Sequence, residues 1–455
     1  MNDARDVDRD IDTLAAFAAT LNVHELPSNV VRVATACVLY GLAVGIGTRR
    51  ARSALIAASA TDTDIGAGSV TRLIDASRMS QSAAVFANAV LLSGRVQGDS
   101  HPCGHLGGVI IPSALASAER AEVTGSEFLS ALVAGYEVAL RIGRDHAADL
   151  STRGFRTTPC YGVFGAATAA ARVQRLGAER VASCLGLAAN FAGGLREYVD
   201  AGTEESPFQA GFAARNGLYV VDLVAQGVSA AKTALQGQAG FYRAYAGAAN
   251  DYGKRLTEKL GREFEFTTVT YKRYPACQFL RGLIRGLSEL RKQAQDAEPA
   301  SIELRMNPYE ADFIGVRYTG PFTSATQTVM SAPFCAALAW ATGTASFDGL
   351  RTFDDEKVLA LVRRISVIAD PARGRYEPLM RVTLSNGTVL EWAEQAGDSN
   401  YRVTWEAAQQ MAKQLCQEVG VPDALANRLI ECAANIENEA RVAPLVSAVC
   451  AATTA

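Results

Sequence analysis

Apolar residues recur at helical spacing through most of residues 1–264. In the segment LPSNVVRVATACVLYGLAVGIG, Pro27 stands where a helix can begin. One stripe of this segment consists of Val30, Ala34, Cys37, Gly41 and Val44. The same spacing returns in SAAVFANAVLLSG, GSEFLSALVAGYEVALRIG, GVFGAATAAARVQRLG and ERVASCLGLAANFAGG, each of which ends in glycine. The pattern predicts an all-helical region whose small residues allow close packing.

The pattern changes near residue 265. FEFTTVTYKRY, over residues 264–274, is β-branched and aromatic and predicts a strand, as do ASIELRMN and RRISVIAD. LMRVTLSNGTVLEW alternates on both sides of Asn386-Gly387, the pair typical of a two-residue type I′ hairpin turn. A helix is expected over residues 278–292. These elements predict an α+β domain over residues 265–397.

After residue 397 the spacing is helical again, from NYRVTWEAAQQMAKQLCQEVG to the end. A chain of 455 residues is long enough for two domains. The fold class that follows is mostly α. We expect a large all-helical domain of residues 1–264 and 398–455, into which a smaller α+β domain, residues 265–397, is inserted.

Composition and charge narrow the class of partner. With a net charge of −3, nothing suggests a nucleic acid or an anionic membrane surface. We expect no apolar run to be long enough to span a membrane. The charged N-terminus lacks the features of a secretory signal, so a soluble, cytoplasmic protein is expected. The nine cysteines form no C-x-x-C pair. Cys103 lacks a visible fourth ligand beside its neighbouring histidines, so no metal is expected.

Two of the four histidines lie in DSHPCGHLGG, between two apolar helical segments. A histidine there can act as general base or acid, and an adjacent carboxylate can orient it. His105 or His101 is therefore a candidate base, with Asp99 and Ser100 as orienting groups. The alternative is a polar turn in which one histidine caps a helix and the other is solvated.

Two further clusters could bind an anion. RGFRTTPCYGVFG places Arg156, Thr157 and Tyr161 at the start of a helix, where N–H groups and a guanidinium suit a carboxylate. YKRYPACQFLRGLIRGL offers Lys272 with Arg281 or Arg285, whereas its cysteine reads as a buried thiol. The alternative for the first cluster is a surface arginine before an ordinary helix. No dinucleotide fingerprint, Walker lysine or G-x-S-x-G elbow occurs.

The order of these segments resembles the MmgE/PrpD family, which includes 2-methylcitrate dehydratases, cis-aconitate decarboxylases and iminodisuccinate epimerases. The resemblance rests on LPSNVVRVATACVLYGLAVGIG, DSHPCGH, AGYEVALRIG, GFRTTPCYGVFGAATAAA, GTEESPFQAGFAARNGL, YKRYPAC and SAPFCAALAWATG. It implies a helical domain with a smaller α+β lid, a homodimer, no metal or organic cofactor, and proton transfer alpha to a carboxylate of a small substrate.

The resemblance also assigns site residues. The family histidine matches His105, and His101 matches an extra histidine of some members. Lys272, Tyr274 and, in the lid, Tyr318 match substrate-binding positions. Several family groups are changed, among them a histidine that has become Arg156, a lysine that has become Ser206, and the histidine that usually follows K-x-Y-P-x-C, which has become Arg281.

Arginine grips a carboxylate but cannot act as a base. The leading hypothesis is therefore a cofactor-independent, dehydratase-like lyase that acts on an altered carboxylate-bearing substrate. Specialised biosynthesis, as opposed to central metabolism, would account for such a change of substrate. An isomerase, either an epimerase or a cyclase, follows from the same enolate-type intermediate and comes second. The rival is a non-catalytic binding protein with the family fold.

Overall fold

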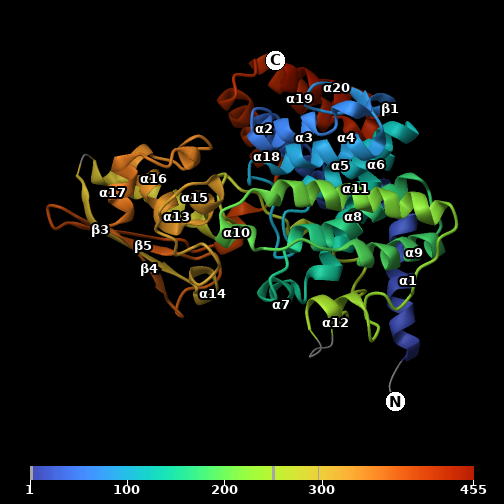
Figure 1. Ribbon diagram of the computed structural model, residues 1–455, viewed down its shortest axis with the longest axis horizontal. Helices are drawn as coiled ribbons and strands as arrows, with labels where there is room; N and C mark the ends of the chain where they lie inside the picture. Colours follow the sequence, from blue (N-terminus) through green and yellow to red (C-terminus); the bar gives the residue numbers. More distant parts are fainter. Residues whose placement is uncertain (1–3, 248–251, 296) are drawn as a thin grey trace. The chain divides into compact units, whose positions relative to one another are not determined.

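The structure is a computed structural model that describes every residue except 1–3, 248–251 and 296 (Figure 1). The chain divides into two compact units. The helical unit comprises Met1–Arg196, Glu205–Val269 and Val403–Ala455, and the sheet unit comprises Glu197–Glu204 and Thr270–Arg402.

These bounds differ from the predicted division in two ways. The second unit runs from Thr270 to Arg402, where residues 265–397 were expected. The short segment Glu197–Glu204 belongs to it as well, although it precedes the expected boundary. The reason is local: the Thr326 hydroxyl donates to the carbonyl of Thr203 at 2.7 Å, and the helix in this segment packs on the one that contains Thr326.

Helices make up most of the helical unit. Its α-helices are α1 (Ala4–Thr20), α2 (Ser28–Thr48), α3 (Arg52–Ser59), α4 (Gln81–Ser93), α5 (Gly107–Ala121), α6 (Gly125–Gly143), α7 (Ala147–Thr152), α8 (Thr157–Val173), α9 (Ala178–Ala188), α11 (Glu205–Ala225), α12 (Phe241–Tyr245), α18 (Trp405–Glu418), α19 (Asp423–Ala434) and α20 (Ala443–Thr454). Its 3-10 helices are η1 (Val23–Glu25), η2 (Asp62–Asp64), η3 (Ala189–Phe191), η4 (Glu265–Thr268) and η8 (Ile436–Asn438). Strands β1 (Ile65–Thr71) and β2 (Arg78–Met79) pair antiparallel, so this unit is not all-helical as expected.

The helical core is closely packed because small residues face one another. Helix α8 lies beside α5, α6 and α11 (Figure 1). A Cβ on Gly165 of α8 would lie 2.4 Å from Cδ1 of Ile110 on α5, and one on Gly135 of α6 would lie 2.7 Å from the Gly165 carbonyl oxygen. A single added methyl group would therefore force these helices apart.

Helix α2 confirms the helix expected after Pro27 and corrects another expectation. Its 21 residues have a mean hydropathy of 1.8 over the most apolar window, which is long and apolar enough to cross a membrane. The judgement that no run reaches this length was therefore wrong. However, 78% of that window is buried inside the unit, as is typical of a core helix.

The sheet unit contains a four-stranded mixed sheet with the order β4-β3-β5-β6. Its strands are β3 (Pro299–Met306), β4 (Ile365–Ala369), β5 (Leu379–Leu384) and β6 (Val389–Ala393), and β3 pairs parallel with β4 and antiparallel with β5. Its helices are α10 (Tyr198–Ala201), η5 (Gln278–Leu280), α13 (Arg281–Ala294), α14 (Pro308–Ala311), α15 (Ala325–Met330), α16 (Ala332–Thr342), η6 (Gly349–Arg351), α17 (Glu356–Val362) and η7 (Gly397–Tyr401). The mostly α fold class and the last three predicted strand segments are thus confirmed.

The hairpin between β5 and β6 has a different turn from the one expected. A type I′ turn needs positive φ at both central residues, but Gly387 has a φ of 85° whereas Asn386 is not among the residues with positive φ. The N–H of Gly387 donates to the carbonyl of Leu384 at 2.9 Å, and the N–H of Leu384 donates to the carbonyl of Thr388 at 2.8 Å. This is the pattern of a three-residue loop with a glycine bulge.

The strand predicted over residues 264–274 is absent. The segment instead forms η4 and a single bridge between Thr270 and Arg402. The carboxylate of Glu137 on α6 accepts the N–H groups of Glu265 (3.1 Å) and Phe266 (3.0 Å), which a strand would have offered to a neighbouring strand. The Glu137 side chain therefore takes the place of the neighbouring strand that the β-branched and aromatic residues led us to expect.

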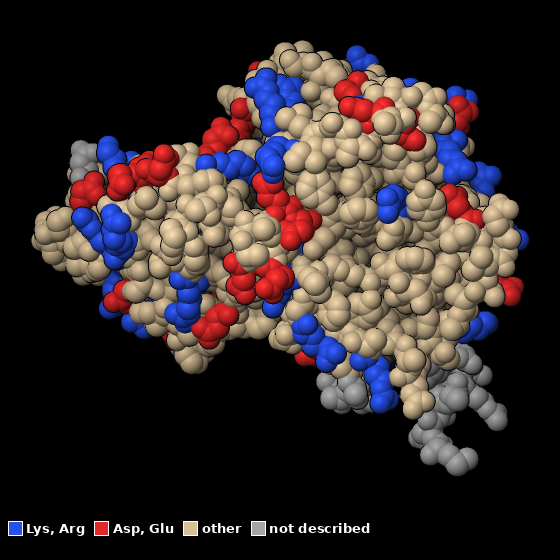
Figure 2. Space-filling view, viewed as in Figure 1, with Lys and Arg blue, Asp and Glu red and all other residues tan. Residues whose placement is uncertain are grey.

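On the face drawn in Figure 2, Lys and Arg side chains are interspersed with Asp and Glu side chains. No field of a single sign covers that face. A strongly basic patch is the usual electrostatic footprint of a nucleic-acid-binding surface, and this face lacks one.

Candidate active site

The polar loop of residues 98–106 connects α4 to α5 and is built around a tight turn. The N–H of His101 donates to the carbonyl of Gly104 (3.0 Å), and the N–H of Gly104 donates back to the carbonyl of His101 (2.8 Å). Gly104 has a φ of 111°, and a Cβ on it would lie 2.7 Å from the main-chain nitrogen of Thr158. Because glycine tolerates both conditions, the turn rests directly against the start of α8.

Asp99 fixes the exit of this loop into α5. Its buried carboxylate accepts the N–H of Gly107, the first residue of α5, at 2.8 Å, and the hydroxyl of Tyr136 on α6 at 2.7 Å. Burial and the nearby Asp99 charge raise the pKa of Tyr136 well above its ordinary value, so this hydroxyl stays a donor. These contacts show the carboxylate capping α5, and its expected role of orienting a histidine stays a prediction.

His105 is oriented by main-chain and hydroxyl groups. Its Nδ1 lies 2.8 Å from the main-chain carbonyl oxygen of Asp99, and its N–H donates to the Thr158 hydroxyl at 3.0 Å. A carbonyl oxygen only accepts, so Nδ1 carries the proton of the neutral ring and Nε2 is the basic nitrogen. The residue is partly exposed, as a group that exchanges protons with a ligand must be.

His101 is held in the opposite tautomer. It is 7% exposed, its Nδ1 accepts the N–H of Cys103 at 3.1 Å, and its Nε2 lies 3.4 Å from a carboxylate oxygen of Glu265. The proton of the neutral ring is therefore on Nε2, and the Nδ1 lone pair is already engaged. The two candidate bases thus differ: Nε2 is the basic nitrogen of His105, whereas His101 engages Nδ1 with Cys103 of the loop and Nε2 with Glu265.

The remaining groups of the loop are buried. Ser100 is 1% exposed and Cys103 is not exposed at all. Burial raises the pKa of the Cys103 thiol well above its ordinary value, so a thiolate nucleophile or ligand is disfavoured. Among the described residues, no group of three or more His, Cys, Asp or Glu side chains is placed to hold a metal ion.

The arginine cluster lies at the N-terminal end of α8. Arg156 is the residue that precedes α8, and one guanidinium nitrogen donates to the carbonyl of Ser206 (2.5 Å) and to Oε1 of Gln209 (3.3 Å), both on α11. Thr157, which begins α8, is partly exposed. His105 reaches the same helix end through Thr158. A base and a cation therefore flank one helix N-terminus, whose own partial charge is positive.

Tyr161 lies one turn further along α8 and faces the core. It has no exposed surface, and its ring packs edge-on against His146 with centroids 5.5 Å apart. Its hydroxyl has no hydrogen-bond partner among the described residues, and burial raises the pKa of this hydroxyl well above its ordinary value. Within the helical unit, the expected substrate contact is therefore enclosed by packed side chains.

Four predicted residues belong to the sheet unit. Lys272 is fully buried and donates to the carbonyl of Ala276 at 3.3 Å. Arg281 pairs with Asp398 and donates to the Thr270 hydroxyl at 2.9 Å, which gives it a structural task within this unit. The other two are Tyr274, which is 9% exposed, and Tyr318, whose hydroxyl donates to the carbonyl of Pro321 at 2.5 Å. Their roles toward a substrate remain predictions.

Comparison with known proteins identifies the family. Residues 12–252 match the MmgE/PrpD N-terminal domain, and residues 274–438 match the MmgE/PrpD C-terminal domain. The chain belongs to the MmgE/PrpD family. The resemblance inferred from the order of the segments is thereby confirmed.

Three MmgE/PrpD relatives are similar over part of their length. The chain is 28% identical over 298 residues to the cis-aconitate decarboxylase-like protein oryM of Aspergillus oryzae, and the aligned region covers 62% of each chain. It is 25% identical over 291 residues to cis-aconitate decarboxylase of Aspergillus terreus (61% of this chain, 59% of the relative). It is 27% identical over 209 residues to cis-aconitate decarboxylase of Homo sapiens (44% and 42%). The chain therefore spans about three fifths or less of each relative.

Two of the changes from the MmgE/PrpD motifs meet in space. The resemblance predicts that Arg156 takes the place of a motif histidine and Ser206 that of a motif lysine. The Arg156 guanidinium donates to the main-chain carbonyl of Ser206. The structure thus brings these two predicted site positions together.

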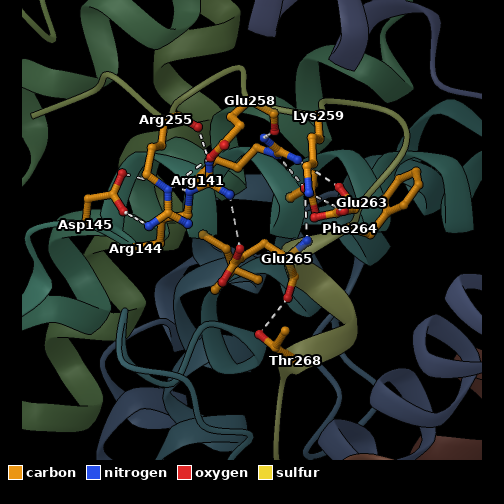
Figure 3. A network of polar contacts seen from close by, with 12 residues as sticks. Arg141, Arg144, Asp145, Arg255, Glu258, Lys259, Glu263, Phe264, Glu265 and Thr268 are labelled. Atoms are coloured by element: carbon orange, nitrogen blue, oxygen red, sulfur yellow. Dashed lines mark hydrogen bonds and ion pairs between the residues drawn. The ribbon is translucent and has the colours of Figure 1, made fainter.

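Sequence reasoning missed a segment that is bound to α6 by hydrogen bonds from a buried arginine. Residues 252–268, here called the strap, are hydrogen-bonded to α6, and Figure 3 shows several side chains of both. Arg141 and Glu137 form an ion pair on α6 that is almost fully buried. Arg141 also donates to three strap carbonyls, those of Leu256 (3.2 Å), Glu258 (2.8 Å) and Glu263 (2.8 Å). The Glu-x-x-x-Arg spacing was visible in the sequence, but its burial was not.

Proposed function

We propose that the protein is a lyase-type enzyme that moves a proton alpha to a carboxylate of a small carboxylate-bearing substrate, with His105 as the base. The family resemblance implies that it does so without a metal or organic cofactor. The substrate we expect differs from methylcitrate, because the motif histidine and lysine have become Arg156 and Ser206.

The observation that carries this proposal is the hydrogen bond between His105 Nδ1 and the Asp99 carbonyl. It holds the ring in the tautomer whose Nε2 can take a proton. The Thr158 hydroxyl holds the main chain of the same residue. A base that is held in one orientation loses little entropy when it reacts.

The positively charged groups beside His105 suit the negative charge that forms on the substrate. When Nε2 removes the alpha proton, the electron pair moves into the carboxylate and gives an enolate-like dianion. The guanidinium of Arg156 and the N-terminus of α8 are positioned beside this base and favour negative charge there. Arginine stays protonated throughout, so we assign it to binding and leave both proton transfers to His105.

Two lyase reactions follow from the same groups. In a dehydration, the electron pair returns to form a double bond and expels hydroxide from the neighbouring carbon, which leaves as water with the proton from His105. In a decarboxylation, the bond to carbon dioxide breaks first, its electron pair stays on carbon, and protonated His105 supplies the proton. The relatives named cis-aconitate decarboxylase support the lyase class.

The test is hydrogen exchange in D₂O followed by proton NMR. Purified protein is incubated with citrates, aconitates, iminodisuccinate, amino dicarboxylates and cyclic imino acids. We expect deuterium uptake alpha to a carboxylate, or a new product, that is lost in His105→Ala. The matched control is His24→Ala, whose side chain is 61% exposed and outside the loop.

The products decide between the reaction classes. Release of water or carbon dioxide supports a lyase, whereas exchange with inversion or ring closure and no leaving group identifies an isomerase instead. If the wild type exchanges no proton on any of these acids but still binds one of them by calorimetry, the protein is a binding module and the proposal fails.

A further inference from the structure

The strap carries, near its C-terminal end, a carboxylate that contacts the proposed catalytic loop. Glu265 begins η4, and its side chain lies 3.4 Å from Nε2 of His101 and 3.2 Å from a guanidinium nitrogen of Arg144, the residue that follows α6 (Figure 3 shows Arg144 and Glu265). Its main chain is held by Glu137, which accepts the N–H of Glu265 at 3.1 Å. Glu265 is thus fixed at both its main chain and its side chain.

We propose that Glu265 is a positioning residue that holds the catalytic loop by fixing the tautomer and the orientation of His101. The inference rests on the proposed function, because it assigns to the positioned loop the task of presenting His105. Glu265 itself contacts neither the base nor a substrate-binding group of the helical unit in the interactions described above.

The path from Glu265 to the base is short and made of directional bonds. The carboxylate lies 3.4 Å from Nε2 of His101 and favours the proton on that nitrogen, while Nδ1 accepts the N–H of Cys103 at 3.1 Å. The same His101 closes the tight turn with Gly104 through two main-chain hydrogen bonds. The next residue is His105, so a rotation of the His101 ring would disturb the turn that places the base.

The environment keeps Glu265 ionised, as this task requires. Contact with His101 is the largest cause that lowers its pKa, followed by Arg144, and together they bring the pKa to about 2. The carboxylate therefore remains an acceptor for His101 at any pH at which a histidine base can work.

A pocket gives solvent access to this carboxylate. Glu265 lines a cavity of about 570 Å³ together with other strap residues, the C-terminal end of α6 and the start of α2. These include Arg144, Arg255, Glu258, Lys259 and Glu263. A formate ion is small enough to enter this cavity, so it can replace the carboxylate in a variant that lacks one.

The first measurement reads the histidine rings directly. The chain has four histidines, so ¹⁵N-histidine labelling gives four ring systems, assigned by single substitutions. The expected wild-type spectrum has His101 protonated at Nε2 and His105 protonated at Nδ1. In Glu265→Ala we expect both ring signals to shift or broaden. In the control Glu263→Ala, which removes an exposed partner of Lys259 in the same pocket, neither should move.

The second measurement reads catalysis. With the substrate found by the exchange panel, Glu265→Ala should lower kcat by about 10- to 100-fold and leave KM within about twofold, because orientation and not binding is lost. Glu265→Gln keeps an acceptor oxygen for His101 and should retain more activity than the alanine variant. Added formate should restore part of the kcat of Glu265→Ala and should not affect Glu263→Ala.

The two hypotheses fail separately. Unchanged His101 and His105 signals in Glu265→Ala, or a loss that appears in KM alone, would overturn the positioning role even if the enzyme is active. A wild type without exchange activity would end the proposed function, and the ring signals would still decide the link from Glu265 to His101. If the alanine variant does not fold, Glu265→Leu, which keeps most of the volume but offers no acceptor to His101, supplies the same NMR comparison.

Discussion

Replacement of Arg141 by methionine should destabilise the helical unit strongly. Arg141 is 2% exposed and donates to Glu137 at 2.5 Å and to three strap carbonyls. The methionine would fill most of the volume but leave the carboxylate of Glu137 buried without its cation. Burial already raises the pKa of Glu137, because its charged form is poorly solvated.

The size of the stability loss depends on the hydrogen bonds that Glu137 keeps in the variant. Breaking a buried pair by removing one partner costs about 3–5 kcal/mol. The two N–H groups of Glu265 and Phe266 still bind the carboxylate, so we place the loss in the free energy of unfolding near the lower end, about 3 kcal/mol. The double variant Glu137→Gln/Arg141→Met removes the stranded charge and should recover about half of this loss.

Urea unfolding followed by circular dichroism measures the loss, and hydrogen exchange with mass spectrometry locates it in the strap. We expect faster exchange over residues 252–268 in Arg141→Met. The control is Lys259→Met, which removes an exposed i,i+4 pair with Glu263 and should leave the transition unchanged. A loss of less than about 1 kcal/mol for Arg141→Met, or no added exchange in the strap, would refute this account of the buried pair.

Three further outcomes are expected. The pKa of Glu265 lies at about 2, below its ordinary value, so its contribution to stability is complete above about pH 5 and is lost as the pH falls toward 2. Over this pH range the free energy of unfolding of Glu265→Gln should therefore fall by about 1–2 kcal/mol less than that of the wild type, a figure that allows for the partial exposure of Glu265. Gly107→Ala would place a methyl group 2.6 Å from the tyrosine hydroxyl that binds the cap of α5, so thermal unfolding should show a loss of about 1–3 kcal/mol, whereas Gly177→Ala, with no atom within 4 Å, should be neutral. Iodoacetamide should label the partly exposed Cys432 in the native protein and not Cys103, and mass spectrometry that finds Cys103 modified would contradict its burial.

Local periodicity predicted the elements that depend on neighbouring residues. Helices α2, α4 and α6 follow the segments in which apolar residues recur at helical spacing, because the buried face of a helix is written into that spacing. Strands β5 and β6 follow their alternation for the same reason. The strand expected over residues 264–274 failed because its N–H groups are taken by Glu137, which lies more than 100 residues earlier in the chain.

The sequence predicted which residues form the candidate site but not how their side chains are arranged. The loop residues Asp99, His101 and His105 were recognised from their types, but which ring presents a basic nitrogen depends on two hydrogen bonds of opposite sense. Tyr161 was expected at the site from its place near Arg156, yet its position on α8 turns it into the core.

The sequence by itself determined the family, the mostly helical fold and the loop that carries both histidines, since these depend on residue order and on short-range periodicity. Only the tertiary structure decided the tautomers of His101 and His105 and brought Glu265 beside the loop. A tautomer depends on which donors and acceptors meet within about 3 Å, and spacing along the chain does not contain that distance.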